Sequence, residues 1–163
     1  MDEPTHLSPQ QDRTWSLLVG VMTWLPAELD AHLERAAGVS HAEYQALRWL
    51  SASEDREVHM SGLATTANVT PSHLSRIVAR LEKRHWITRS SDPDDARRTL
   101  ARLTEAGAQL VDRVEPGYAR EVRRLVFDRL DADRAEQLEG LTEAVLTPLR
   151  PDCVRALPPR TSG

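Results

Sequence analysis

Apolar residues recur at helical spacing over much of the chain. In residues 12–37 they fall alternately three and four positions apart, which predicts one amphipathic helix with a single apolar stripe. The residues of this stripe are Trp15, Leu18, Met22, Leu25, Leu29 and Leu33. Pro26 lies within the stretch and is expected to kink or interrupt the helix, and Gly38 is expected to end it.

Capping residues mark the starts of three further helices. Ser40, followed by Glu43 three positions later, forms a capping box. Thr104 and Asp131 each precede a long stretch of periodic apolar residues, as N-caps do. Pro116, which is next to a glycine, is expected to kink the first of these two stretches. The C-terminal part of the chain is therefore predicted to be helical.

Two short helices joined by a tight turn are predicted near the middle of the chain. Ser61 is placed to cap the first helix, and Thr70 with Pro71 is placed to start the second. The turn between them is assigned to residues 67–69. The buried stripe of the second helix consists of Leu74, Ile77, Val78 and Leu81. This arrangement is a helix-turn-helix.

A two-stranded hairpin is predicted directly after the helix-turn-helix. Residues 86–89 and 99–103 are short β-type stretches, and the second alternates apolar and polar side chains with period two. Residues 90–95 between them are rich in serine, aspartate and proline, which predicts a turn. A hairpin in this place is a wing.

These elements together predict a mainly α, winged helix-turn-helix fold with a small β-hairpin wing. One domain spans residues 12–150, with the winged-helix lobe at 40–103. The helices of residues 12–37 and 104–150 carry more apolar surface than the lobe can cover, so we expect them to be dimerisation helices of a homodimer. A monomer whose two ends cover its own core is the alternative.

Positive charge is concentrated in one part of the chain. The chain has a net charge of −4, but residues 70–102 contain eight basic and four acidic side chains. That segment therefore carries +4 and the remainder −8, a distribution that suits phosphate binding at one face. Arginines that merely solvate a helix and a hairpin are the alternative interpretation.

The outward side of the second short helix and the wing supply the candidate DNA contacts. Short hydroxyl side chains near a helix start, followed by an arginine, suit a helix whose first half enters the major groove, where arginine can bond a guanine edge. A wing arginine can enter the neighbouring minor groove. The candidate DNA-binding residues are Ser61, Ser72, His73, Ser75, Arg76, Arg80, Arg97 and Arg98. Asp95 would repel phosphate, so we expect it to pair with an arginine and orient the wing.

Two segments of the predicted lobe have specific patterns. Residues 95–107 place Asp-x-Arg before a strand that leads into Leu-Thr-x-x-Gly, and residues 74–84 read Leu-Ser-Arg-Ile-Val-Ala-Arg-Leu-Glu-Lys-Arg. They resemble the wing and the recognition helix of the MarR family of winged helix-turn-helix transcriptional regulators. The resemblance covers residues 40–107, and the order of helices extends it to nearly the whole chain. Where the family usually has Gly-Leu after the recognition helix, this chain has His85-Trp86, so a histidine is expected in the left-handed conformation.

The resemblance implies a function as well as a fold. It implies a homodimer that binds double-stranded DNA at a pseudo-palindromic operator, with repression as the common default. It also implies regulation by a small effector, often phenolic, or by oxidation or a metal. The cleft that such proteins have between the dimer helices and the lobe gives the ligand-pocket candidates Trp15, Met22, His32, Tyr44 and Trp49. Positions in the core or the dimer seam are the alternative for each of these residues.

Other classes of function find little support in the sequence. No nucleophile elbow, glycine-rich phosphate loop or tight metal-ligand spacing is present, so we expect neither an enzyme, a cofactor nor a metal site. A winged-helix module that binds proteins without touching DNA is the alternative function; the net charge favours it and the basic segment opposes it. Residues 1–11 are polar, and residues 151–163, which include Cys153, are rich in proline and arginine; both stretches are expected to be disordered. With no apolar signal core and no run of membrane-spanning length, the protein is expected to be cytoplasmic, without a membrane partner.

Overall fold

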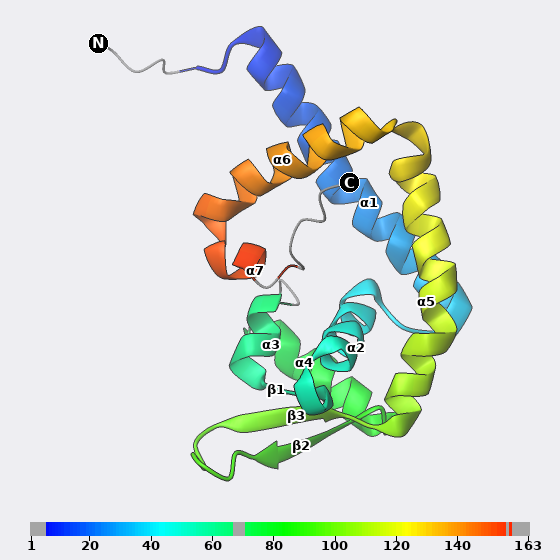
Figure 1. The fold of residues 1–163 in the computed structure, drawn as a ribbon, viewed down its shortest axis with the longest axis vertical. Coiled ribbons are helices and arrows are strands. Elements are labelled where there is room, and N and C mark those ends of the chain that lie inside the picture. Colours follow the sequence, from blue (N-terminus) through cyan, green and yellow to red (C-terminus); the bar gives the residue numbers. More distant parts are fainter. Residues whose placement is uncertain (1–5, 67–70, 156, 158–163) are drawn as a thin grey trace.

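Helices make up most of the protein, and one small sheet lies at one end (Figure 1). The structure is a computed structural model that describes residues 6–66, 71–155 and 157 of the 163-residue chain. In chain order the elements are α1 (Pro9–Ala37), α2 (His41–Ala52), the 3-10 turn η1 (Glu54–Arg56), β1 (Glu57–His59), α3 (Met60–Thr66), α4 (Pro71–Lys83), β2 (Ile87–Ser91), β3 (Thr99–Leu103), α5 (Glu105–Leu125), the 3-10 turn η2 (Phe127–Arg129), α6 (Ala132–Leu149) and α7 (Pro151–Arg155). The mainly α, winged helix-turn-helix prediction is confirmed. The turn predicted at 67–69 and the predicted cap Thr70 lie outside the described residues.

The first helix is longer than its apolar stripe indicated. It begins at Pro9, where Ser8 and Gln11 form a capping box. Residues 9–11 are therefore helical, whereas the sequence predicted them to be disordered. It also continues through Pro26 to Gly38, whose φ of 63° ends it in the left-handed conformation. A proline removes only one backbone hydrogen bond, and the C-terminal half of α1 is held by burial against α5.

The next two helices build the centre of the lobe. The capping box of Ser40 and Glu43 is present at the start of α2, as predicted. Tyr44, Leu47 and Leu50 on this helix are fully buried and form the middle of the hydrophobic core. Ser61 does not cap α3, because β1 leads directly into the helix and α3 already begins at Met60.

The sheet has three antiparallel strands in the order β1-β3-β2. The wing strands β2 and β3 pair Ile87 with Leu103, and β1 adds to the other edge of β3. The sequence did not predict β1, because three residues are too few to show a period-two pattern. His85, at the junction between α4 and the wing, has a φ of 60°, as expected for the position where the family usually has glycine.

The C-terminal helices extend beyond the predicted boundaries. Thr104 and Asp131 cap α5 and α6 as predicted, but α5 continues through Pro116, where a kink was expected. Residues 151–155 form α7, so this part of the predicted disordered tail is helical, and it contacts α3 (Figure 1). Within the described residues, no helix has the length and apolar content needed to cross a membrane.

The core and the apolar surface lie in different parts of the protein. One buried cluster joins α2, α4, the wing strands, the C-terminal half of α1 and the first half of α5. By contrast, the N-terminal half of α1 and all of α6 leave large apolar side chains in solvent. These exposed residues include Trp15, Leu17, Leu18, Val21, Met22, Trp24, Leu138, Leu141, Val145 and Leu149.

Candidate nucleic-acid interface

Helix α4 has one buried and one exposed side. Leu74, Ile77, Val78 and Leu81 are at most 1% exposed, and they fix this side of the helix against the core. The opposite side is polar and open to solvent, and near the start of the helix it consists of Ser72, His73, Ser75 and Arg76. A helix held in this way presents its first two turns outward, where a duplex groove can reach them.

The wing arginines are bonded to Asp95 but stay exposed to solvent. The carboxylate of Asp95 accepts hydrogen bonds from the backbone N–H and the Nε of Arg97, at 3.1 and 3.2 Å, and lies 3.7 Å from Nε of Arg98. The side chain of Arg97 is nevertheless 92% exposed. Asp95 therefore limits the directions that the guanidinium can take without removing it from solvent.

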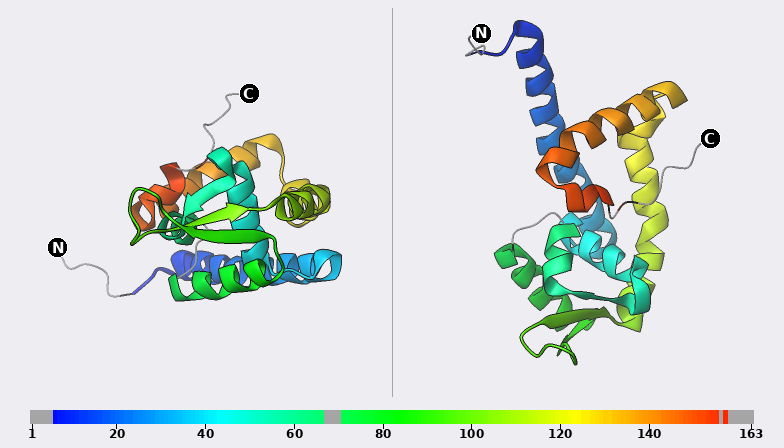
Figure 2. Two further views of the ribbon diagram at one scale, coloured as in Figure 1. Left: turned by 90° about the horizontal axis from the view of Figure 1, so that it is seen from below. Right: turned by 60° about the vertical axis from the view of Figure 1, so that its left-hand side comes forward.

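The loop of the wing is closed by backbone bonds. The N–H of Asp92 donates to the carbonyl of Arg98 at 3.1 Å, and the N–H of Arg98 donates to the carbonyl of Asp95 at 2.8 Å. Helix α3, helix α4 and the wing lie at the end of the molecule opposite the start of α1 and the helix α6 (Figures 1 and 2). The candidate residues on α4 and on the wing thus belong to the same end of the protein.

Arg80 pairs with a carboxylate of another helix, whereas Arg97 and Arg98 pair with Asp95 of their own wing. Its Nε lies 2.6 Å from Oε1 of Glu43, a carboxylate in the capping box of α2 that is only 7% exposed. The sequence placed Arg80 among the DNA contacts, since it follows Arg76 by one helical turn. It missed the partner because Glu43 is 37 residues away.

Several other arginines of the basic segment are also bonded to the protein. Arg84 donates to the carbonyl of Gly38 at 2.6 Å and stacks over the ring of Trp86. Arg89 pairs with Glu82, and Arg102 pairs with Glu57. The charge available to an outside ligand is thus smaller than the sequence count of +4 implied, and it is concentrated on the α4 side and the wing tip.

Ser61 lies on the exposed surface of α3, one residue after the helix begins. Helix α3 packs beside α4 (Figure 1). The place of Ser61 among the candidate DNA contacts stays a prediction.

The five predicted ligand-pocket residues lie in different surroundings, and their place in a ligand pocket stays a prediction. Trp15 and Met22 are about half exposed on the N-terminal half of α1, whereas Tyr44 is fully buried in the core. Trp49 packs against the core, and Nε2 of His32 is buried without a hydrogen-bond partner beside α5. Periodicity placed these side chains on apolar faces but could not show which faces meet.

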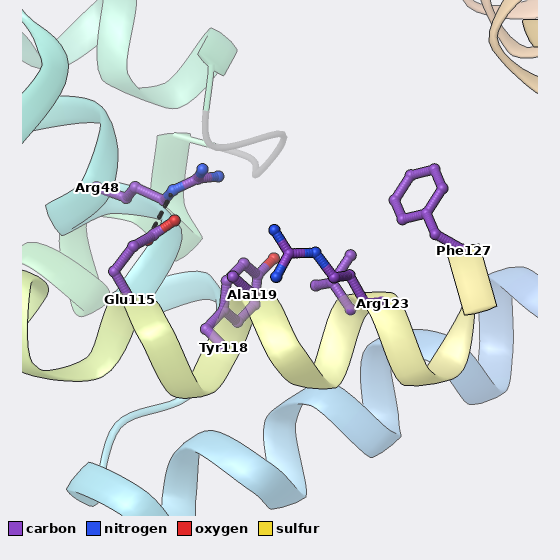
Figure 3. A pocket seen from close by; sticks show the side chains of 7 residues that line it. Arg48, Glu115, Tyr118, Ala119, Arg123 and Phe127 are labelled. Carbon is purple, nitrogen blue, oxygen red and sulfur yellow. Dashed lines mark ion pairs between the residues drawn. The ribbon is translucent and has the colours of Figure 1, made fainter. Parts of the chain in front are cut away.

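A cavity of about 270 Å³ lies instead along α5 (Figure 3). It is lined by Arg48, Glu115, Tyr118, Ala119, Val122, Arg123 and Phe127. Its walls combine an aromatic face, apolar side chains and two arginines. One feature of the sequence points to this cavity: Glu115 and Tyr118 are polar side chains three positions apart on a helix whose neighbouring positions are apolar.

Polar side chains behind this cavity form a connected network. The hydroxyl of Tyr44 donates to Glu115, which also lies 3.1 Å from Nε of Arg48, and Tyr118 lies 3.1 Å from Nε2 of His41. Burial and the bond to Glu115 raise the pKa of Tyr44, and burial also raises the pKa of Tyr118. Burial lowers the pKa of His41, against an opposing contribution from Asp30. Both tyrosines can therefore act as hydrogen-bond donors over a wider pH range than an exposed tyrosine.

Within the described ranges, no three histidine, cysteine, aspartate or glutamate side chains gather closely enough to hold a metal ion. Cys153 is a half-buried cysteine on α7.

Comparison with known proteins gives consistent matches. A sequence model of the MarR family matches residues 39–99. The crystal structure of Sco3205, a MarR family transcriptional regulator from Streptomyces coelicolor in complex with DNA, is 37% identical, with a TM-score of 0.88 over 93% of this chain and 95% of that chain. AbsC, another MarR family regulator from Streptomyces coelicolor, is 28% identical, with a TM-score of 0.84 over 91% of this chain and all of that chain. The transcriptional repressor MprA of Escherichia coli is 29% identical over 71% of this chain, and the match spans 65% of the length of MprA.

Proposed function

Because the chain belongs to the MarR family of transcriptional regulators, we propose that it is a sequence-specific DNA-binding repressor that acts as a homodimer. Its operator is pseudo-palindromic, since a two-fold symmetric dimer presents two identical lobes to the duplex. The proposed activity is binding, without a catalytic step.

One observation carries this proposal: the exposed polar side of α4 and the exposed Arg97 of the wing lie at one end of the molecule. In the proposed complex the first turns of α4 enter the major groove. There Ser72 and Ser75 bond phosphates or base edges, and Arg76 bonds a guanine edge. Arg97 enters the adjacent minor groove, held in direction by Asp95. That Sco3205, which is 37% identical, forms a complex with DNA supports DNA binding by this chain.

The homodimer is supported by the apolar surface at the other end of the molecule. Trp24 on α1 and Leu141 on α6 are 70% and 68% exposed, and further apolar side chains continue both surfaces. Large apolar side chains exposed in this way on neighbouring helical turns are typical of a protein interface. Pairing of α1 and α6 with a second copy would cover them and set the spacing between the two lobes.

The small-molecule effector is assigned to the cavity along α5. The ring of Tyr118 and the side chains of Val122 and Phe127 suit a flat apolar body, while Arg123 suits an acidic group. Arg48 is already paired with Glu115. A phenolic carboxylate combines these features. The effector is thus placed on α5 rather than at the five positions expected from the sequence.

The DNA-binding proposal is tested with duplexes that the wild-type protein selects from a random-sequence library. Replacement of Arg97 by alanine is expected to weaken binding to a selected duplex by about 1–3 kcal/mol, and Arg76→Ala by a similar amount, because each removes a groove contact. Gel-shift titration at physiological salt measures both. Wild-type binding is expected to weaken steeply with added salt, as it does when several phosphates are contacted.

The matched control is Arg129→Ala. Arg129 is an exposed arginine of η2, at the far end of α5 from the wing (Figure 1). Its loss is expected to leave the affinity unchanged. Equal affinities of wild type, Arg97→Ala and Arg76→Ala would contradict the proposed surface, and failure of the wild type to select any duplex would favour the protein-binding alternative.

A further inference from the structure

A nearly buried carboxylate joins the start of α2 to the last turn of α4. Glu43 is 7% exposed and occupies the third position of α2. Its Oε2 accepts the backbone N–H of Ser40 at 2.8 Å, and its Oε1 accepts Nε of Arg80 at 2.6 Å. One side chain therefore caps α2 and holds α4.

The environment of Glu43 keeps it charged. Burial alone would raise its pKa, but the hydrogen bonds from Ser40 and Arg80 and the charge of Arg80 outweigh burial, so that the pKa of Glu43 lies below its usual value. A buried carboxylate without such partners would be costly. The bond to Arg80 is accordingly a short, charge-assisted one with a defined direction.

The position of Arg80 on α4 allows this bond to affect the rotation of the helix. Arg80 follows Arg76 by four residues, so the two lie on the same side of the helix. The apolar residues on the opposite side hold α4 by contacts that have little directional preference. The bond from Arg80 to Glu43 is directional and lies next to the polar side, so it can fix the rotation of α4 about its own axis.

We propose that Glu43 is a positioning residue for DNA recognition, which holds α4, through Arg80, in the rotation that presents Ser75 and Arg76 to base edges. This inference rests on the proposed function. It also reassigns Arg80, which the sequence had placed among the DNA contacts, to a role within the protein. Selectivity for the operator, rather than general attraction to DNA, depends on the pair.

Replacement of Glu43 by glutamine separates the two roles of the side chain. Glutamine can still cap α2, because Gln11 does so in the same position of the capping box of α1. With its oxygen on Ser40, the amide presents an N–H₂ group to Arg80, which has no acceptor to offer. The capping bond is thereby kept while the bond to α4 is lost.

The measured quantity is the affinity ratio between a duplex selected by the wild type and a duplex of unrelated sequence. For Glu43→Gln we expect this ratio to fall about tenfold, in line with the loss of one charge-assisted bond. The dependence of affinity on salt is expected to stay as in the wild type, since no phosphate contact is removed. Near-wild-type thermal unfolding shows that the variant is folded.

A second variant and a double variant keep the test decisive. Arg80→Met removes the partner from the other side, and the double variant Glu43→Gln/Arg80→Met removes both. If the pair acts as a unit, all three proteins show the same reduced ratio. The matched control is Glu121→Gln, which removes a similarly shielded carboxylate, paired with Arg124 within α5, and is expected to keep the ratio of the wild type.

Two outcomes would overturn the inference while leaving the proposed function in place. One is an unchanged ratio in Glu43→Gln. The other is tighter binding by Glu43→Gln to both duplexes with a steeper salt dependence, because Arg80 would then be a phosphate contact that Glu43 restrains. Failure of the wild type to select any duplex would instead overturn the proposed function and this inference together.

Discussion

The same residue type has different roles in this protein, according to its neighbours. Arg97 projects into solvent beside one partly exposed carboxylate, Arg84 stacks on Trp86, and Arg80 donates to a buried carboxylate. Only the first is clearly available to a duplex. A count of charges along a basic segment therefore overestimates the number of DNA contacts, because long-range partners cannot be read from the chain.

At the residue scale, the proposed effector cavity predicts that Arg123 contributes to ligand binding. A hydroxybenzoate that binds the folded protein at one hundred times its Kd would stabilise it by about 2.7 kcal/mol and so raise the Tm. Arg123→Ala is expected to reduce this rise, because the carboxylate of the compound loses a cationic partner. Differential scanning fluorimetry measures the shift.

The control for this experiment is again Arg129→Ala, which leaves the cavity lining intact. It is expected to show the full rise in Tm. Identical shifts in Arg123→Ala and the control would place the effector elsewhere.

At the scale of elements, most of the local capping signals predict helix starts correctly, with Ser61 as an exception, whereas features that depend on tertiary contacts are not predicted. The capping residues Ser40, Thr104 and Asp131 start helices as predicted, because a cap depends on only a few neighbouring residues. The strand β1 could not be predicted, since its three residues form a strand only by pairing with β3, some 40 residues later. The cavity along α5 was missed for a similar reason, since its lining combines Arg48 of α2 with residues of α5 and η2.

The start of α5 depends on close approach to the end of the wing. A Cβ atom on Gly107 would lie 2.2 Å from the carbonyl oxygen of Trp86 and 2.7 Å from Cδ1 of Leu103. Gly107→Ala is therefore expected to destabilise the protein by about 1–3 kcal/mol, because backbone must move to admit the methyl group. Urea unfolding followed by circular dichroism measures the change.

A second glycine supplies the comparison for this prediction. Gly140 lies within α6, where an added Cβ atom would have no neighbouring atom within 4 Å among the described residues. Gly140→Ala is expected to be neutral or to stabilise the helix by up to about 1 kcal/mol. Equal unfolding midpoints for the two variants would show that the space beside Gly107 is larger than the structure indicates.

At the scale of the whole molecule, the two ends are suited to different partners. One end carries α4 and the wing, and the other carries the exposed apolar sides of α1 and α6 (Figure 2). Leu141→Glu is expected to shift the protein from dimer to monomer in sedimentation experiments, because a charge in the centre of an apolar interface is costly. Affinity for a selected duplex is expected to fall with it, since one lobe would bind alone.

Thr147→Glu adds the same charge on the opposite side of α6, two residues beyond Val145 of the apolar surface. This variant is expected to stay dimeric. A monomeric wild type, or a dimeric Leu141→Glu, would speak against assembly through α6.

Helix α2 is short, and two of its consecutive residues point to different helices. Glu43 holds α4, and Tyr44 donates to Glu115 of α5 beside the cavity. The twelve residues of α2 therefore cannot turn about the helix axis without altering both bonds together. A molecule in the cavity that reorients Glu115 changes the bond of Tyr44, and Tyr44 is one peptide unit from Glu43, which holds α4. Helix α2 thus couples the cavity to the helix that faces the DNA groove.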